Sequence, residues 1–210
     1  MDVRGAIERG DVMALQALLA ADGSRANALI RWGEDGELLS HPIHFVCDRL
    51  FDGTLPAGAG APLVRALVAA GADVDFADGD PLNAAVSLGA PDVVDVLLDA
   101  GARVDGRGLL GETALHWAAY TGADGVVRRL VEQGAPVDVR DGRWSATPLG
   151  WALHGWNEPP PPANQARHAT VVAYLVRVGA VVEPGWLESA RERGRPEVLA
   201  ALSGGAGDAP

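Results

Sequence analysis

A Gly-Ala pair recurs along this chain at intervals close to 33 residues. The pairs begin at Gly71, Gly101, Gly134 and Gly179, so the intervals are 30, 33 and 45 residues. A second marker lies upstream of each pair, and its four copies begin at His41, Asp80, Thr113 and Thr147. Repetition with a period of about 20 to 50 residues indicates an array of units, each of which packs against its neighbours. The chain is therefore expected to fold as a solenoid.

The clearest copy of the repeated unit covers residues 113–138. It begins with Thr113-Ala-Leu-His116, continues with the pair Ala118-Ala119 and closes at Gly134-Ala135. Threonine caps the free N–H groups at the start of a helix, and glycine takes the left-handed conformation that ends one. Alanine allows two helices to approach closely. Each unit is therefore predicted to be two short antiparallel helices.

These motifs resemble the ankyrin repeat, whose unit of about 33 residues carries Thr-Pro-Leu-His, an alanine pair, a second helix and a closing Gly-Ala. The resemblance implies an all-α solenoid of stacked helix-turn-helix units with β-turn fingers. Its register places four internal repeats at residues 41–74, 80–104, 113–137 and 147–182, between capping repeats at 2–22 and 186–203. Residues 1–203 are expected to form a single domain, and the glycine-rich tail 204–210 to be disordered.

The longest interval, which ends at Gly179, contains an insertion. The finger at residues 141–146 has one extra residue, and 11 further residues around Pro159–Pro162 follow the first helix. Four consecutive prolines favour a stiff polyproline II conformation. Two interpretations stay open. The segment is either a functional element, as a rigid flap or a ligand for a proline-binding module, or a tolerated surface loop.

The charge of the chain argues against nucleic acid as a partner. All 17 basic residues are arginine, and 28 acidic residues give a formal net charge of -11. A protein that binds phosphates needs a basic face, which this chain lacks. Because aspartates are frequent in the fingers, the partner is expected to be neutral or basic. The complete absence of lysine also suggests a GC-rich bacterial genome.

The chain lacks the signals of membrane insertion and export. Its longest apolar runs fall short of the about 20 residues that span a bilayer, and its first residues do not resemble a signal peptide. We therefore expect a cytoplasmic monomer with no membrane partner. The single cysteine, Cys47, is expected to be a small buried hydrophobic residue.

The resemblance also implies a binding surface, because ankyrin repeats bind partners through the finger tips and the exposed side of the first helix. The function implied is protein or peptide binding in a concave groove. By register, the groove is expected to contain Asp48, Arg49, Phe76, Asp78, Leu109, Leu110, Glu112, Tyr120, Arg143, Trp144, His154 and Trp156. Tyr120, Trp144 and Trp156 form a candidate cluster of binding hot spots. Trp117 and Trp151 are expected to pack in the core.

A small-molecule-binding protein or an enzyme is the alternative function. Acid–base chemistry in the same groove would use Asp48, Asp78, Glu112, Tyr120 and His154. Such an activity would be atypical of the family. The sequence contains no nucleophile elbow, phosphate loop or dinucleotide motif, so no cofactor is expected.

The histidines are expected to have structural roles. His44 and His116 occupy the family's histidine position, where the resemblance implies a hydrogen bond to the backbone of the adjoining finger. Asn83 and Gly150 replace this histidine in the other copies, and His168 is expected to cap a second helix. His41 stands where threonine is usual. No metal site is expected, because the His41-x-x-His44 spacing does not match a known zinc site.

Overall fold

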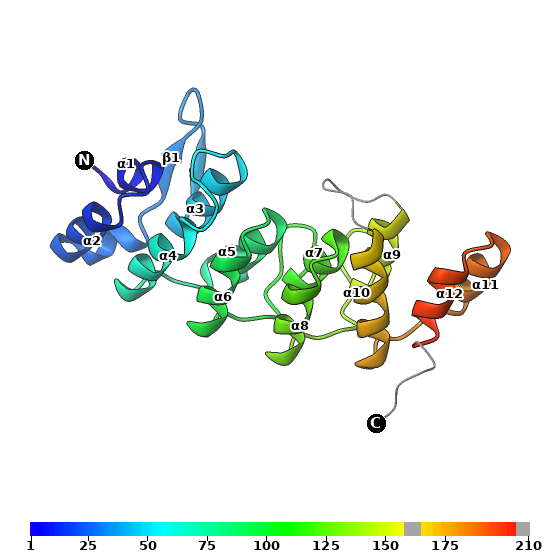
Figure 1. The fold of residues 1–210 in the computed structure, drawn as a ribbon. Helices are drawn as coiled ribbons and strands as arrows, with labels where there is room; N and C mark the ends of the chain where they lie inside the picture. The colour runs from blue at the N-terminus through cyan, green and yellow to red at the C-terminus, as the bar shows by residue number, and fades with distance from the viewer. Residues whose placement is uncertain (158–164, 205–210) are drawn as a thin grey trace. The chain divides into compact units, whose positions relative to one another are not determined.

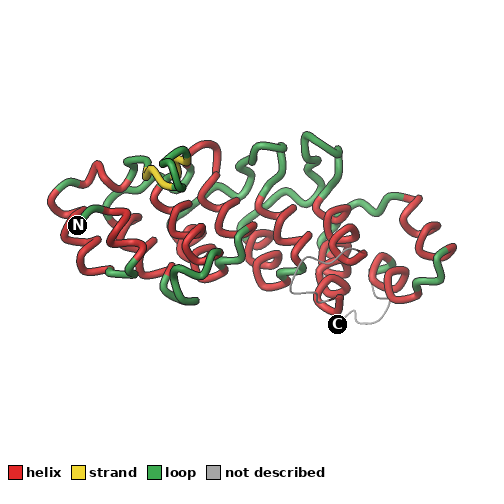
Figure 2. The backbone as a smooth tube through the Cα atoms, turned by 90° about the horizontal axis from the view of Figure 1, so that it is seen from above, coloured by secondary structure: helices red, strands yellow, loops and turns green. Residues whose placement is uncertain are grey.

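The computed structural model describes residues 1–157 and 165–204, and helices dominate it (Figure 1). Long loops, such as residues 100–113 and 133–147, connect successive helix pairs, and a small two-stranded sheet interrupts the helical order (Figure 2). The chain divides into two compact units, residues 1–108 and residues 109–210. The division falls in the finger between two predicted repeats, and a single domain over residues 1–203 stays a prediction.

The first unit, residues 1–108, holds three pairs of helices. They are α1 (Val3–Glu8), α2 (Val12–Ala21), α3 (Pro42–Phe51), α4 (Gly60–Ala69), α5 (Phe76–Ser87) and α6 (Pro91–Asp99). The first helices of successive pairs pack together in the order α1, α3, α5, and the second helices pack in the order α2, α4, α6. Burial between neighbouring pairs is the arrangement that a solenoid requires.

A β-hairpin lies between α2 and α3, in the stretch between the expected cap at residues 2–22 and the first expected internal repeat at 41–74. A short 3₁₀ helix (Gly23–Ala26) precedes its strands β1 (Ile30–Trp32) and β2 (Leu38–Ser40). The strands are antiparallel, with Ile30 opposite Ser40. The Trp32 indole N–H donates to the Ser40 hydroxyl at 2.8 Å and the Trp32 ring packs edge-on against Phe45 at 5.8 Å, which ties the hairpin to α3.

The described residues of the second unit, which begins at residue 109, also hold three pairs of helices. They are α7 (Ala114–Thr121), α8 (Asp124–Glu132), α9 (Pro148–Asn157), α10 (Gln165–Arg177), α11 (Pro184–Glu192) and α12 (Pro196–Leu202). Helix α7 packs on α9, while α8 packs on α10 and α10 on α12.

The helix ends follow the predicted signals. The Thr147 hydroxyl accepts the backbone N–H of Gly150 at 3.3 Å at the start of α9. Gly122 closes α7 in the left-handed conformation, with φ at 68°. His41, which replaces threonine at the start of α3, caps that helix instead, because its ring Nδ1 accepts the Ile43 N–H at 3.4 Å.

The core lies between adjacent helix pairs, as expected. Leu115, Val127 and Leu130 are fully buried, and Ala118 lies buried where α7 approaches its neighbours. Cys47 is buried as well, and burial raises the pKa of its thiol. The predicted all-α repeat solenoid is therefore confirmed as a class of fold. The expectations for Pro159–Pro162 and for most of the tail fall outside the described residues.

A membrane span is not found among the helices of the described residues, since none combines the required length with sufficient apolar character.

The close approach of three helices in the second unit generates a test at Gly155. A Cβ atom at Gly155 would overlap the Tyr120 carbonyl oxygen and come within 2.8 Å of His168 Nε2. We expect Gly155→Ala to lower the free energy of unfolding by about 1–3 kcal/mol, as overpacking does. Urea denaturation measures the change.

Gly125 on α8 provides the matched control, because a Cβ there would meet no atom within 4 Å. Gly125→Ala should leave stability unchanged or raise it by up to about 1 kcal/mol. Equal effects of the two substitutions would contradict this packing.

Candidate functional site

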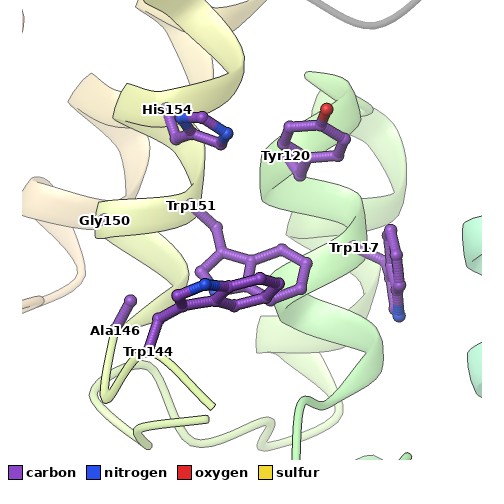
Figure 3. Close-up of a pocket in the computed structure, with 7 residues that line it drawn as sticks. All are labelled: Trp117, Tyr120, Trp144, Ala146, Gly150, Trp151 and His154. Carbon is purple, nitrogen blue, oxygen red and sulfur yellow. The ribbon is translucent and has the colours of Figure 1, made fainter. Parts of the chain in front are cut away.

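The second unit contains a pocket of about 460 Å³ between α7, the finger at residues 141–146 and α9 (Figure 3). Seven residues line it, namely Trp117, Tyr120, Trp144, Ala146, Gly150, Trp151 and His154. Five of the seven carry aromatic or imidazole rings, and Ala146 and Gly150 are small. We call this the aromatic pocket.

Trp151 is the central ring of the aromatic pocket. Its centroid lies 5.2 Å from that of Trp117, 6.0 Å from that of Tyr120 and 5.6 Å from that of Trp144. The planes cross at 82°, 84° and 70°, so each pair is edge-to-face. Aromatic pairs favour this geometry because a positive ring edge meets a negative ring face.

Tyr120 on α7 faces His154 on α9 across the upper part of the pocket in Figure 3. Their rings are nearly parallel, with an angle of 18° and centroids 5.8 Å apart. Each side chain lies about one helical turn from a tryptophan of the same helix, Trp117 on α7 and Trp151 on α9. Helical spacing therefore brings two rings from each helix to the pocket.

Trp144 forms the exposed edge of the pocket, with 58% of its surface exposed. It belongs to the finger rather than to a helix. The Arg143 guanidinium lies 5.0 Å from the centre of the Trp144 ring, within the range of a cation–π interaction. A large exposed ring beside a hollow is a feature typical of interaction sites.

The Asp141 carboxylate holds the finger in place. One oxygen accepts the backbone N–H groups of Arg143 at 2.8 Å and Trp144 at 2.6 Å. The other accepts the Ala146 N–H at 3.1 Å and the Trp151 indole N–H at 3.0 Å. The Asp141 side chain thus positions Trp144 in the finger and Trp151 on α9.

Burial and hydrogen bonding act in opposite directions on the pKa of Asp141. Only 4% of the residue is exposed, and this burial alone would raise the pKa. The N–H donors stabilise the charged form more strongly, so the pKa of Asp141 is lowered from its ordinary value. Asp141 is therefore a carboxylate at neutral pH.

Glu112 plays a similar part for Trp117. It is 6% exposed, and one of its oxygens accepts the Trp117 indole N–H at 3.3 Å. The other accepts the backbone N–H of Leu110 at 2.8 Å. Glu112 was predicted to face a partner, but its carboxylate is buried and supports the pocket from behind.

The histidines of the second unit connect neighbouring elements. The His116 ring Nε2 lies 3.1 Å from the Ala146 carbonyl oxygen in the next finger, which confirms the predicted bond. Its Nδ1 accepts the Thr113 backbone N–H at 3.0 Å. His168 was expected to cap a helix. Its Nε2 lies 2.8 Å from the Tyr120 carbonyl oxygen, so this side chain connects α10 to the end of α7.

Trp156 is misplaced by the sequence prediction. It is 3% exposed and does not line the pocket, so the expectation of a groove-facing ring is wrong. Successive residues of a helix are rotated by about 100°, so Trp156 points roughly 200° away from His154. Leu109 is fully exposed and Leu110 is half-buried, and both precede α7.

The predicted site residues of the first unit contact different neighbours. Asp48 accepts from the Ser40 hydroxyl at 3.3 Å. The Arg49 guanidinium lies 4.4 Å from the centre of the Trp32 ring. The Phe76 ring stacks on the His41 ring, with centroids 4.8 Å apart. Asp78 forms an ion pair with Arg103 at 3.1 Å.

His44 departs from the expected backbone contact. Its Nδ1 lies 2.6 Å from a carboxylate oxygen of Asp80, and its Nε2 lies 3.8 Å from Asp48. Burial would lower the pKa of His44, but the hydrogen bond and charge of Asp80 outweigh it, so the pKa is raised. Within residues 1–157 and 165–204, no group of three or more His, Cys, Asp or Glu side chains is arranged to hold a metal ion.

Trp117 and Trp151 are the pocket residues that the sequence prediction assigned to the core. Trp151 is 7% exposed, so it packs in the interior and also presents part of its ring to the hollow. The spacing of Trp117 from Tyr120, and of Trp151 from His154, is three residues in both helices. Three-residue spacing places side chains on one helix face, and that signal could have identified both residues.

The role of Asp141 can be tested with Asp141→Asn. The variant should lose about 1.5–3 kcal/mol of unfolding free energy at pH 7, the range for hydrogen bonds to a charged group. A lowered pKa means that the carboxylate stabilises the fold above its unfolded pKa of about 3.9 and that this contribution is lost as pH falls further. The difference in unfolding free energy between wild type and Asp141→Asn, measured by urea denaturation, should therefore become smaller below about pH 4.

Glu132→Gln is the control for the loss of one negative charge, because Glu132 is exposed on α8 of the same unit. If the loss of unfolding free energy in Asp141→Asn does not depend on pH, or equals that of Glu132→Gln, Asp141 does not support the finger through its charge.

Comparison with known proteins connects this geometry to a family. A family model of ankyrin repeats, three copies long, matches residues 55–141 and, in a second match, residues 82–185. PhlB of Serratia liquefaciens is 42% identical over 72 residues, which are 34% of this chain and 32% of that protein.

Similar segments occur in proteins of eukaryotes. Serine/threonine-protein kinase 12 of Arabidopsis thaliana is 34% identical over 84 residues, or 37% of this chain and 18% of the kinase. Palmitoyltransferase Hip14 of Drosophila melanogaster is 38% identical over 68 residues, or 32% of this chain and 11% of that protein. The chain spans about a third or less of the length of these relatives. The family matches cover more than half of the chain, which therefore belongs to the ankyrin-repeat family.

Proposed function

We propose that this chain is a protein-binding module and that its aromatic pocket receives a segment of a partner protein. Ankyrin repeats generally mediate protein–protein interaction. The observation that carries the proposal is the exposure of Trp144 beside a pocket of about 460 Å³. Within the family, the site rather than the fold decides what is bound.

The chemistry of the pocket suits an anchor residue of a partner. Tryptophan and tyrosine dominate the energetics of protein interfaces, above all where a pocket excludes water. Trp144 offers an exposed ring, and Tyr120 and Trp151 line the hollow beside it. The finger is held by hydrogen bonds of Asp141, so little conformational entropy would be lost on binding.

The charge of the chain favours a neutral or basic partner. The formal net charge is -11, which attracts basic segments over the distance set by ionic screening. A cytoplasmic, monomeric protein of bacterial origin, without nucleic acid, membrane or cofactor, remains our working description. We take residues 41–74, 80–104, 113–137 and 147–182 as four internal repeats between caps at 2–22 and 186–203.

Acid–base catalysis in the groove has less support. Asp78 pairs with Arg103 at 3.1 Å, and the two oxygens of Glu112 accept N–H groups of Trp117 and Leu110. Groups committed to such contacts are poor proton shuttles. Tyr120 and His154 lie close together in the second unit, but their stacked rings serve binding equally well.

Phage-displayed random peptides selected on the purified chain test the proposal. Replacing Trp144 by alanine should weaken the binding of selected peptides by about 2 kcal/mol or more, as expected of a hot spot. Because the ring is exposed, unfolding free energy should change by no more than about 0.5 kcal/mol. Isothermal titration calorimetry and urea denaturation give the two quantities.

Two variants serve as controls. Phe51 is an aromatic residue that is also exposed but lies on α3, so Phe51→Ala should leave peptide binding unchanged. Trp156→Ala should instead lower unfolding free energy by about 3–5 kcal/mol, because that ring is buried. Peptides that bind Trp144→Ala and wild type equally would disprove the pocket as the binding site.

A further inference from the structure

The aromatic pocket presents an unusual electrostatic lining. None of the described residues that line it is an arginine, and the chain contains no lysine. Its rings are those of Trp117, Tyr120, Trp144, Trp151 and His154. The face of an aromatic ring carries negative electrostatic potential, and its edge carries positive potential. The chemistry of a ligand therefore depends on which parts of the rings remain available.

The positive edges of two indoles are already occupied. The Trp117 indole N–H donates to Glu112 at 3.3 Å, and the Trp151 indole N–H donates to Asp141 at 3.0 Å. Each of these hydrogen bonds directs a donor away from a ligand and toward an anion. The indole N–H groups of these two rings are therefore not available to a ligand, and any part of a ring face that borders the hollow attracts cations.

The two carboxylates also leave negative charge directly behind the rings. Glu112 and Asp141 are both buried, and within the described part of the chain neither forms an ion pair. Their partners are neutral N–H groups, which spread the negative charge but do not cancel it. Burial reduces screening by solvent, so this charge acts more strongly on a group inside the pocket than it would at the surface.

Ring orientation provides more than one face for such a group. The plane of Trp151 is nearly perpendicular to those of Trp117 and Tyr120, at 82° and 84°. Rings at right angles around a hollow can contact one cation from different sides. The volume of about 460 Å³ accommodates a long side chain.

Guanidinium groups lie over aromatic rings repeatedly within this chain. Arg49 lies 4.4 Å from the centre of the Trp32 ring, and Arg128 lies 4.5 Å from that of Tyr174. At the pocket itself, the Arg143 guanidinium lies 5.0 Å from the centre of the Trp144 ring. Trp144 thus already attracts a guanidinium, from an exposed residue of its own finger.

We propose that the aromatic pocket binds an arginine side chain of the partner, an inference that rests on the proposed function of this pocket. Arginine suits the site better than lysine, because its guanidinium is planar, weakly hydrated and stacks on aromatic faces. The Tyr120 hydroxyl oxygen is a pocket atom that can accept one of its N–H groups. An apolar anchor would fill the hollow but would gain nothing from the two buried carboxylates.

A pair of probe peptides isolates the charge. Acetyl-Gly-Arg-Gly-amide and its citrulline counterpart have nearly the same shape, but citrulline is neutral. Each is titrated into the full chain while the tryptophan indole N–H signals are followed by NMR. We expect the arginine peptide to shift the Trp144 and Trp151 signals saturably and to bind about tenfold more tightly than the citrulline peptide, a factor typical of a desolvated cation–π contact.

A matched pair of variants at His154 provides the second measurement. His154 is exposed, so neither substitution should disturb folding. His154→Lys places a positive charge at the pocket and should weaken the arginine peptide about tenfold or more, and the citrulline peptide only as much as His154→Gln does. His154→Gln removes the ring without introducing a charge and should weaken both peptides to a similar, smaller extent.

Each outcome distinguishes this inference from the proposed function. Equal affinity for the two probe peptides would overturn the arginine anchor. So would the absence of a saturable shift with the arginine peptide while phage-selected peptides shift the same indole signals, and in both cases the pocket would still be a peptide site. If the selected peptides also leave the pocket signals unchanged, the proposed function fails as well.

Discussion

The buried carboxylate of Asp141 is the interaction on which the candidate site depends. It accepts the backbone N–H groups of Arg143, Trp144 and Ala146, and it accepts the indole N–H of Trp151. The finger lies outside the helices and strands. Backbone carbonyls accept the N–H groups of Asp141 and Gly142, and the Asp141 carboxylate accepts those of three of the residues that follow. The same carboxylate orients the central ring of the pocket and leaves negative charge behind it. The His116 bond to the Ala146 carbonyl then fastens the finger to α7.

Much of this arrangement could be predicted because ankyrin repeats are periodic. The recurring markers indicated pairs of helices. Thr147 caps the start of α9 as expected, and Gly134 follows the end of α8 in the expected left-handed conformation. The register also placed His116 against the next finger and brought Tyr120, Trp144 and His154 to one surface, where the structure has them. These successes share one cause. Each residue sits at a position whose environment is set by the repeat itself, through helix periodicity or through contact with the next unit.

The remaining features depend on particular neighbours rather than on the repeat. His44 occupies the same position as His116 but bonds a side chain, because the next marker begins with Asp80 instead of threonine and its carboxylate is a stronger acceptor than a backbone carbonyl. The register placed Trp156 in the groove together with His154, although a helix turns residues two positions apart to nearly opposite sides. The β-hairpin at residues 30–40 has strands of only three residues, too short for a clear alternation of apolar and polar positions. Trp151 packs in the core and also lines the pocket. The sequence prediction assigned each residue either to the core or to the surface, so it could not identify a residue that belongs to both.

Hydrogen exchange at individual N–H groups, followed by NMR, tests most directly whether Asp141 holds the finger and the central ring as one structure. If it does, the Trp144 backbone N–H and the Trp151 indole N–H should exchange as slowly as the backbone N–H of Leu115 in the core of α7, with free energies of opening close to that of global unfolding. The Trp144 indole N–H, on a ring that is 58% exposed, should exchange rapidly. Rapid exchange of the Trp144 backbone N–H and the Trp151 indole N–H, while Leu115 stays protected, would mean that the finger opens independently of the helices and that Asp141 does not organise the pocket.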